Sequence, residues 1–412
     1  MTFSFGEKVT KKNFDTPRRC RGLQAGYPNR NCIFATHMKA FFKAHRKLHI
    51  WLLADLCLLA AFWLCRGSRT VMTALSGAAT VVCRALGRVC YRVPFSVAEV
   101  LCVLLVVFAL GYLVWSIAAV TRATGRRGHR AYSAVLGAVC LGLTVYVGFC
   151  YLWGVHYYTA DFQERSGIYA QPVALEDLEA VTAYFADRLS ETADRVERDE
   201  NGLFAVSRQE ILEDSVHAYD AVEEQFPFLA FDDPGVKGVR FSRIMSALDF
   251  TGVYCPFTGE SNVNIDSPAC LLAATAAHEL AHQRSIASEQ ECNFLAILAS
   301  TTCGSDVYAY SGWLLGYIHL GNALYKADPE AYAAVLATLP ETVRTDLRDN
   351  NAYWAQFQDG AARKASNKVY EGFLKSYGEE RGLQSYGTVV DMLVVYYKDA
   401  AHSQDGRSSV KS

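Results

Sequence analysis

The hydrophobic pattern divides the chain into two regimes. Three long apolar stretches fall within the first 160 residues, at about 49–65, 100–120 and 134–156, and Asp55 is the one acidic residue within them. A helix needs roughly 20 predominantly apolar residues to cross a bilayer. We therefore predict a membrane domain over residues 38–160 with three N-terminal transmembrane helices.

Beyond residue 160 the pattern is typical of a folded, mostly helical domain over residues 161–412. Apolar residues recur there at spacings of three and four, as in an amphipathic helix: Leu175, Leu178, Val181, Phe185 and Leu189. Residues 250–265, FTGVYCPFTGESNVNI, are rich in aromatic and β-branched residues with Gly and Pro between them. They predict a small hairpin or edge strand. The expected fold class is mainly α with a small β element.

The first 37 residues precede this pattern. Met38 is followed by a basic stretch, KAFFKAHRK, and then by the first apolar stretch, which is a common arrangement at the start of a membrane protein. We predict that residues 1–37 are a disordered or wrongly assigned extension.

Lysines and arginines set the expected orientation. Basic segments at 38–47 and 121–130 flank the apolar stretches, and the positive-inside rule places such segments in the cytoplasm. The domain after the third stretch then lies outside the cytoplasm. Five arginines between residues 66 and 92 oppose this assignment. We expect residues 73–91 to form an amphipathic helix in the membrane interface, with its arginines reaching toward water.

Charge and cysteine content exclude some kinds of function. The formal net charge is -2, which gives no basis for nucleic-acid binding through bulk charge. The 13 cysteines show no paired spacing of the kind found in zinc knuckles, and those in the apolar stretches are interpreted as small buried hydrophobic residues.

The stretch HELAH, residues 278–282, is the strongest candidate for chemistry. We predict a helix over residues 268–284, with Asp266 or Ser267 as its cap and Pro268 in its first turn. His278 and His282 are four positions apart, so they project from one helix face and can bind one zinc ion. Glu279 lies beside them as the candidate general base.

A catalytic zinc usually has three protein ligands and one open position. The next predicted helix supplies two acidic candidates for the third ligand, Glu291, which we prefer, and Glu289. Ser288 and Glu291 also match the spacing of a capping box, in which Glu291 has a purely structural role. Both interpretations of Glu291 stay open.

Zinc with a neighbouring carboxylate indicates hydrolysis, most naturally of a peptide bond. A hydrogen-bond donor for the developing oxyanion is also expected. The candidates are Tyr254, Tyr308, Tyr310, His319 and Tyr386. Residues 261–265, SNVNI, are a candidate strand for pairing with a substrate backbone. Their alternative role is in a structural hairpin.

The string AHELAHQRSIASEQECNFLA resembles a bacterial membrane family known as domain of unknown function 3810, regarded as zinc metallopeptidases. The segments WGVHYY, SALDFTGVYCPFTGESNVN and LQSYGTVVDMLVVYY are also similar to that family. Members tend to have Asn in place of His156 and Ala in place of Cys292. The pattern E-x-N-F-x-A is similar to the third-ligand helix of ImmA/IrrE-type metallopeptidases, which implies Glu291 as a ligand.

This resemblance implies a zincin-like domain with Zn²⁺ as cofactor, a peptide or protein substrate and membrane lipid as a partner. It also implies a multi-pass protein of the bacterial inner membrane. A second hypothesis is a membrane sensor or scaffold with a structural or regulatory zinc site. Glu279 distinguishes the two, because a structural site has no need of an acid beside its ligands.

Overall fold

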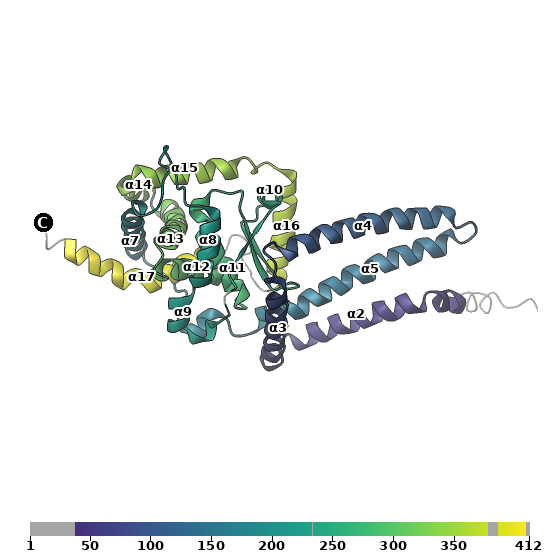
Figure 1. The fold of residues 1–412 in the computed structure, drawn as a ribbon. Helices are drawn as coiled ribbons and strands as arrows, with labels where there is room; N and C mark the ends of the chain where they lie inside the picture. The colour runs from purple at the N-terminus through teal and green to yellow at the C-terminus, as the bar shows by residue number, and fades with distance from the viewer. Residues whose placement is uncertain (1–37, 233, 378–385, 409–412) are drawn as a thin grey trace, which may run out of the picture. The chain divides into compact units, whose positions relative to one another are not determined.

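The structure, a computed structural model, describes residues 38–232, 234–377 and 386–408 (Figure 1). The predicted extension at 1–37 lies outside the described residues. From Trp51 onward the chain forms one compact unit, separate from the residues before it. The described part is mainly helical, as predicted, with one small sheet.

From Arg46 onward, the described part contains twelve longer α-helices and four shorter ones. The longer helices are α2 (Arg46–Cys65), α3 (Arg69–Cys90), α4 (Val97–Arg122), α5 (Arg127–Leu152), α7 (Leu175–Ala193), α11 (Leu272–Gln283), α12 (Glu289–Thr302), α13 (Asp306–Ala327), α14 (Pro329–Thr338), α15 (Glu341–Ala355), α16 (Ala361–Ser376) and α17 (Tyr386–Ser408). Shorter helices are α6 (Phe162–Ser166), α8 (Arg208–Asp214), α9 (Asp220–Gln225) and α10 (Ser242–Ala247).

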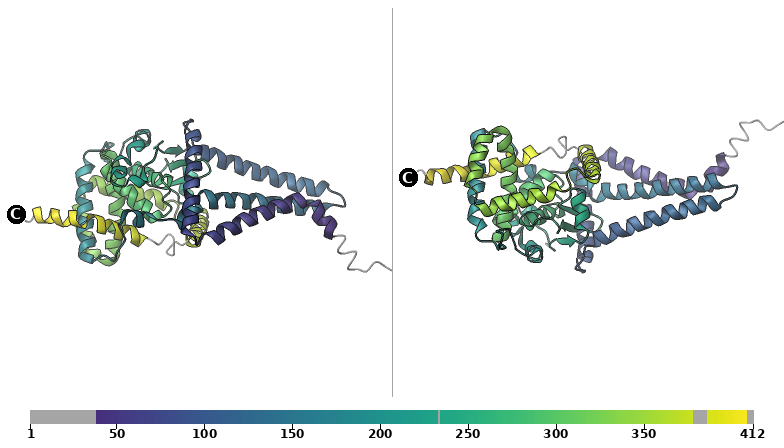
Figure 2. Two further views of the ribbon diagram at one scale, coloured as in Figure 1. Left: turned by 90° about the horizontal axis from the view of Figure 1, so that it is seen from below. Right: turned by 90° about the horizontal axis from the view of Figure 1, so that it is seen from above.

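Four described helices, α2 to α5, are long and apolar enough to cross a membrane, whereas the sequence predicted three transmembrane helices. The predicted stretches match α2, α4 and α5. The additional helix is α3, whose alternation of apolar residues with arginines made it look interfacial in the sequence. Figures 1 and 2 show α3 crossing the ends of α4 and α5, which run side by side.

The ends of the apolar helices lie against the domain that follows. Phe62 near the end of α2 packs edge-to-face on Tyr151 at the end of α5, with 5.8 Å between ring centroids. At the start of α4, the amides of Val97 and Ala98 donate to the buried Glu260 carboxylate, at 3.2 and 2.8 Å. A carboxylate is favourable at a helix N-terminus, where amide groups are unpaired.

α3 is bound to the domain through its polar side. Arg84 donates to the carbonyl of Ala230 at 2.9 Å, and Arg88 forms an ion pair with Asp232. Gly87 and Gly259 approach so closely that a Cβ on Gly87 would lie 2.9 Å from the Gly259 carbonyl oxygen. Two of the five arginines that opposed the predicted orientation, Arg84 and Arg88, therefore have partners in the domain.

The sheet contains three strands in the order β1 (Lys237–Val239), β3 (Glu260–Asn264) and β2 (Gly252–Cys255). β2 and β3 form the predicted hairpin, and β1 adds to β3 in parallel. β3 is central and buried along its whole length. The prediction that residues 261–265 pair with a substrate is therefore wrong, because neighbouring strands already occupy both edges of β3.

The motif helix α11 is shorter than predicted. Pro268 precedes a 3₁₀ turn, Ala269–Leu271, and neither Asp266 nor Ser267 caps the helix, so the predicted cap is wrong. Asp266 instead accepts from Tyr353 at 2.6 Å. The early amide of Ala274 finds its partner in the Ser311 hydroxyl of α13, at 2.9 Å. Tertiary packing thus replaces the local cap that the sequence suggested.

The core of the domain surrounds α11 and α12, which are almost wholly buried. α13 and α17 pack against them, and α7 packs in turn on α13 and α17, with Gly316 of α13 facing α7. A Cβ at Gly316 would lie 2.2 Å from the Phe185 ring. α11 is therefore held on several sides, which fixes the position of its histidines.

Candidate metal centre

The two histidines of α11 both direct Nε2 toward the Glu289 carboxylate. Nδ1 of His278 lies 2.9 Å from the Asn293 side-chain oxygen, and Nδ1 of His282 lies 2.8 Å from the Ile286 carbonyl oxygen. A carbonyl oxygen only accepts, so Nδ1 carries the proton in both rings. Nε2 is then the atom of each ring that can bind a metal, and each ring is oriented by its second nitrogen.

Glu289, at the start of α12, faces these nitrogens. Its carboxylate oxygens lie 3.1 Å from His278 Nε2 and 3.5 Å from His282 Nε2. The three side chains are between 8 and 23% exposed. Two imidazoles and one carboxylate, converging with Nε2 directed inward, match the donor set of a catalytic zinc.

Glu291 points to another part of the fold. Its carboxylate accepts from the backbone amides of Phe162 and Gln163, at 3.0 and 3.1 Å, and so caps the short helix α6. Of the two candidate third ligands, the structure therefore places Glu289, and not the preferred Glu291, beside the two histidines. The capping box is also absent, because the Ser288 side chain makes no cap bond at the start of α12.

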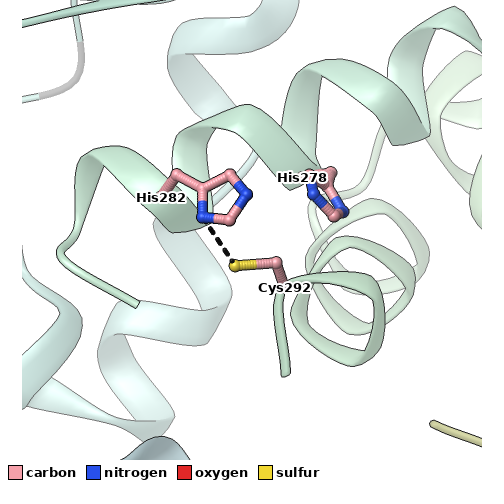
Figure 3. Close-up of side chains that lie close together, drawn as sticks. All are labelled: His278, His282 and Cys292. Carbon is pink, nitrogen blue, oxygen red and sulfur yellow. Dashed lines mark hydrogen bonds between the residues drawn. The ribbon is translucent and has the colours of Figure 1, made fainter. Parts of the chain in front are cut away.

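Cys292 lies close to the histidines but on the wrong side for a shared ion. Its Sγ and one nitrogen of each ring lie within 4.8 Å of one another. However, Sγ is 3.2 Å from Nδ1 of His282, and the dashed line in Figure 3 marks this contact. This Nδ1 already donates to the Ile286 carbonyl oxygen. Burial also raises the pKa of Cys292 to about 12. The Nε2 side, with Glu289, is the better metal centre.

Glu279 lies beside the histidines and is 3% exposed. Its Oε2 has no hydrogen-bond partner among the described residues. Burial raises the pKa of Glu279 to about 7, although His278 and His282 act in the opposite direction. A buried carboxyl with one unpaired oxygen and a pKa near neutrality is suited to accept and release a proton.

Glu289 and His282 form a charged pair. Burial opposes charge on both groups, but the imidazoles hold the pKa of Glu289 well below its ordinary value. In turn, the carboxylate of Glu289 helps to raise the pKa of His282 well above its usual range. A cation is thus the natural counterpart of Glu289, whether it is an imidazolium or a metal.

Several residues around the site were missed in the sequence. Tyr370 of α16 donates its hydroxyl hydrogen to Glu289, and Trp153 packs edge-to-face on His282 with 5.5 Å between centroids. Asn293, which orients His278, had a usable signal, because it lies four positions after Glu289 and so shares its helix face. Tyr370 and Trp153 come from distant segments and had none.

The five candidate oxyanion donors lie in different surroundings. The hydroxyls of Tyr308 and Tyr310 are bound in the core, to the Ile211 carbonyl and to Asp346. His319 is near enough to His278 for that ring to add to the effect of burial, which lowers the pKa of His319 to about 4. Tyr254 stacks at an angle on Trp153. The side chain of Tyr386 lies outside the described residues.

β2 runs directly past Glu279. A Cβ on Gly252 would lie 2.3 Å from Glu279 Oε1, so the strand approaches this closely only because residue 252 has no side chain. β2 is an edge strand with β3 on one side only. In the described part of the chain no strand pairs with the outer edge of β2, and such an edge next to a candidate base can pair with an extended peptide.

The family model described as protein of unknown function (DUF3810) matches residues 76–394, and the chain belongs to this family. The matched residues include the sheet, the HELAH helix and Glu289. No curated protein and no solved structure matches the chain.

Proposed function

We propose that the chain is a membrane-anchored, zinc-dependent metallopeptidase with a zincin-like domain. The observation that carries this proposal is the convergence of His278 Nε2, His282 Nε2 and the Glu289 carboxylate beside the unpaired Oε2 of Glu279. Zinc would supply a Lewis acid that lowers the pKa of a bound water from 15.7 to about 7.

The side chains of the protein have separate roles in this proposal. Glu279 accepts a proton from the attacking water and delivers it to the leaving amine. Asn293 and the Ile286 carbonyl hold the histidine rings in the orientation that directs Nε2 inward. Tyr370 fixes the Glu289 carboxylate. The edge of β2 aligns the peptide, taking the role first assigned to residues 261–265.

We further propose that α2, α4 and α5 span the membrane and that α3 lies in its interface. Phe62 near the end of α2 lies in one buried apolar cluster with Tyr377, which follows α16. The start of α4 contacts Glu260 of β3, and Trp153 at the end of α5 contacts His282. A spanning α3 would put the end of α2 and the start of α4 on opposite sides of the bilayer. Three spans and the basic segments at 38–47 and 121–130 then place the domain outside the cytoplasm, in the inner membrane of a bacterium.

The alternative is a sensor or scaffold with a structural zinc. A structural site normally has four protein ligands, and the Nε2 side offers three within the described residues. The buried Glu279 carboxyl also has no use in such a site.

The decisive experiment compares membranes containing the native protein with membranes containing Glu279→Gln. The variant should retain zinc, since Glu279 is not a ligand, but lose about 10²- to 10⁴-fold in peptide hydrolysis, as expected for a general base. Zinc content and envelope peptides are measured together. Equal cleavage by both proteins would refute the proposed role of Glu279.

A further inference from the structure

The loop between β1 and α10 is hydrogen-bonded to the first turn of α4. The Glu99 carboxylate accepts from the amides of Arg240 and Phe241, at 3.2 and 2.7 Å. These residues are more than 140 positions apart in sequence from Glu99. The bonds fix the height of the loop along α4.

A groove of about 350 Å³ lies between this loop and α4. Phe95, Val100, Val103 and Leu104 form one side, and Arg240 and Phe241 form the other. Leu104 is seven residues into α4, which corresponds to about 10 Å along the helix axis. If α4 spans a bilayer, the groove therefore extends into the acyl region of the leaflet next to the domain.

The side chains of the groove are unusually exposed for their chemistry. Phe241 is 56% exposed and Leu104 59%, and Ile244, one helical turn after Phe241, is 58% exposed. The groove is continuous with the apolar surface of α4. No residue in the most apolar stretch of α4 is buried in the protein. Continuity with a lipid-facing surface favours lipid, rather than water or a folded partner, as the occupant.

The charged groups of the groove favour a phospholipid in particular. The Glu99 carboxylate is occupied by two amides. The Arg240 side chain is exposed at the mouth of the groove, where its guanidinium can pair with a phosphate. An arginine next to an aromatic ring is a common arrangement at the membrane interface.

We propose that this groove binds one phospholipid molecule, with an acyl chain between α4 and Phe241 and its phosphate on Arg240. The inference rests on the proposed span of α4 and is independent of the metal centre. It makes Arg240, Phe241 and the first turn of α10 a second point of contact between the domain and the bilayer.

The test places a photoreactive benzoyl-phenylalanine at position 241 in the full-length protein. The protein is reconstituted in vesicles of phosphatidylethanolamine and phosphatidylglycerol, irradiated and examined by mass spectrometry. Phospholipid adducts are expected at position 241. The same residue at Phe108, in the middle of α4, is the positive control, and at Tyr325, exposed on α13, the negative control.

The outcomes separate the two levels of the inference. Lipid adducts at 108 but not at 241, or adducts to a second protein at 241, would overturn the groove as a lipid site. Adducts at neither position would overturn the span of α4 as well. Arg240→Glu should lower the yield at 241 several-fold, and an unchanged yield would overturn the phosphate contact.

Discussion

The two faces of α12 carry the same acidic residue type in opposite environments. Glu289 faces α11 and lies against two imidazoles, which hold its pKa well below the ordinary value. Glu291 faces α6, where burial and the nearby Asp161 raise its pKa to about 7. Two positions on one helix thus separate a charged candidate ligand from a buried structural acid.

The difference follows from helix geometry. At 3.6 residues per turn, positions two apart point to nearly opposite sides, so only one of the two acids can face the histidines. Positions four apart share a face, and Asn293 accordingly lies beside Glu289 against His278. On the other face, Phe294 packs on Phe162 near Glu291. The polar or apolar character of the neighbours indicates which acid is available to a metal.

The largest expected effect is on the histidines themselves. His278→Ala and His282→Ala each remove one ligand, so the purified protein should lose its bound zinc. Metal content by mass spectrometry checks this, with Cys292→Ala as the matched control. That variant should keep about one zinc, because Sγ lies on the Nδ1 side of His282. Zinc loss in Cys292→Ala with retention in both histidine variants would reverse the choice of donor atoms.

Replacement of each of the two acids by Gln gives the sharpest comparison. Glu289→Gln replaces a carboxylate by a much poorer zinc ligand and should weaken zinc binding by more than about 100-fold. Glu291→Gln should leave zinc affinity within a few-fold of the native value, since the cap on α6 needs only an acceptor oxygen. Competition with a chelator measures both. The opposite ranking would restore Glu291 as the ligand.

The sequence predicted those features that depend on local periodicity. The apolar helices, the hairpin at 250–265 and the shared face of His278 and His282 follow from spacing within one segment. Local spacing could not decide between Glu289 and Glu291 as the third ligand, because the residues that bind Glu291, Phe162 and Gln163, are about 130 positions away in sequence. The prediction for the N-terminal cap of α11 was wrong for the same reason, since the Ala274 amide donates to Ser311 on another helix.

Asn293→Ala should have an intermediate effect. It removes the acceptor that orients His278 but leaves all three candidate ligands in place. Loss of such a partner typically weakens metal binding by about 10- to 100-fold. The same chelator competition checks this, and Asn293→Asp, which keeps an acceptor oxygen, should recover most of the affinity. A loss as large as that of Glu289→Gln would mean that Asn293 does more than orient the ring.

The last prediction concerns the pH dependence of stability and tests the face of α12 that carries Glu291. The pKa of Glu291 is raised from 4.5 to about 7, mainly by burial, so the folded protein holds this proton more tightly than the unfolded chain. The resulting stability is fully present below pH 4.5 and is lost as the pH rises through about 7. At 1.36 kcal/mol per unit, the loss amounts to at most about 3 kcal/mol.

Glu291→Gln has no proton to lose, so its melting temperature relative to that of the native protein should rise between pH 4.5 and 7 and then stay constant. Measurement in excess chelator removes the contribution of zinc. The difference between the two proteins also cancels groups common to both, including Glu279, whose pKa lies in the same range. A difference in melting temperature that is independent of pH would mean that Glu291 is charged when folded, and the contrast between the two faces of α12 would then reduce to geometry.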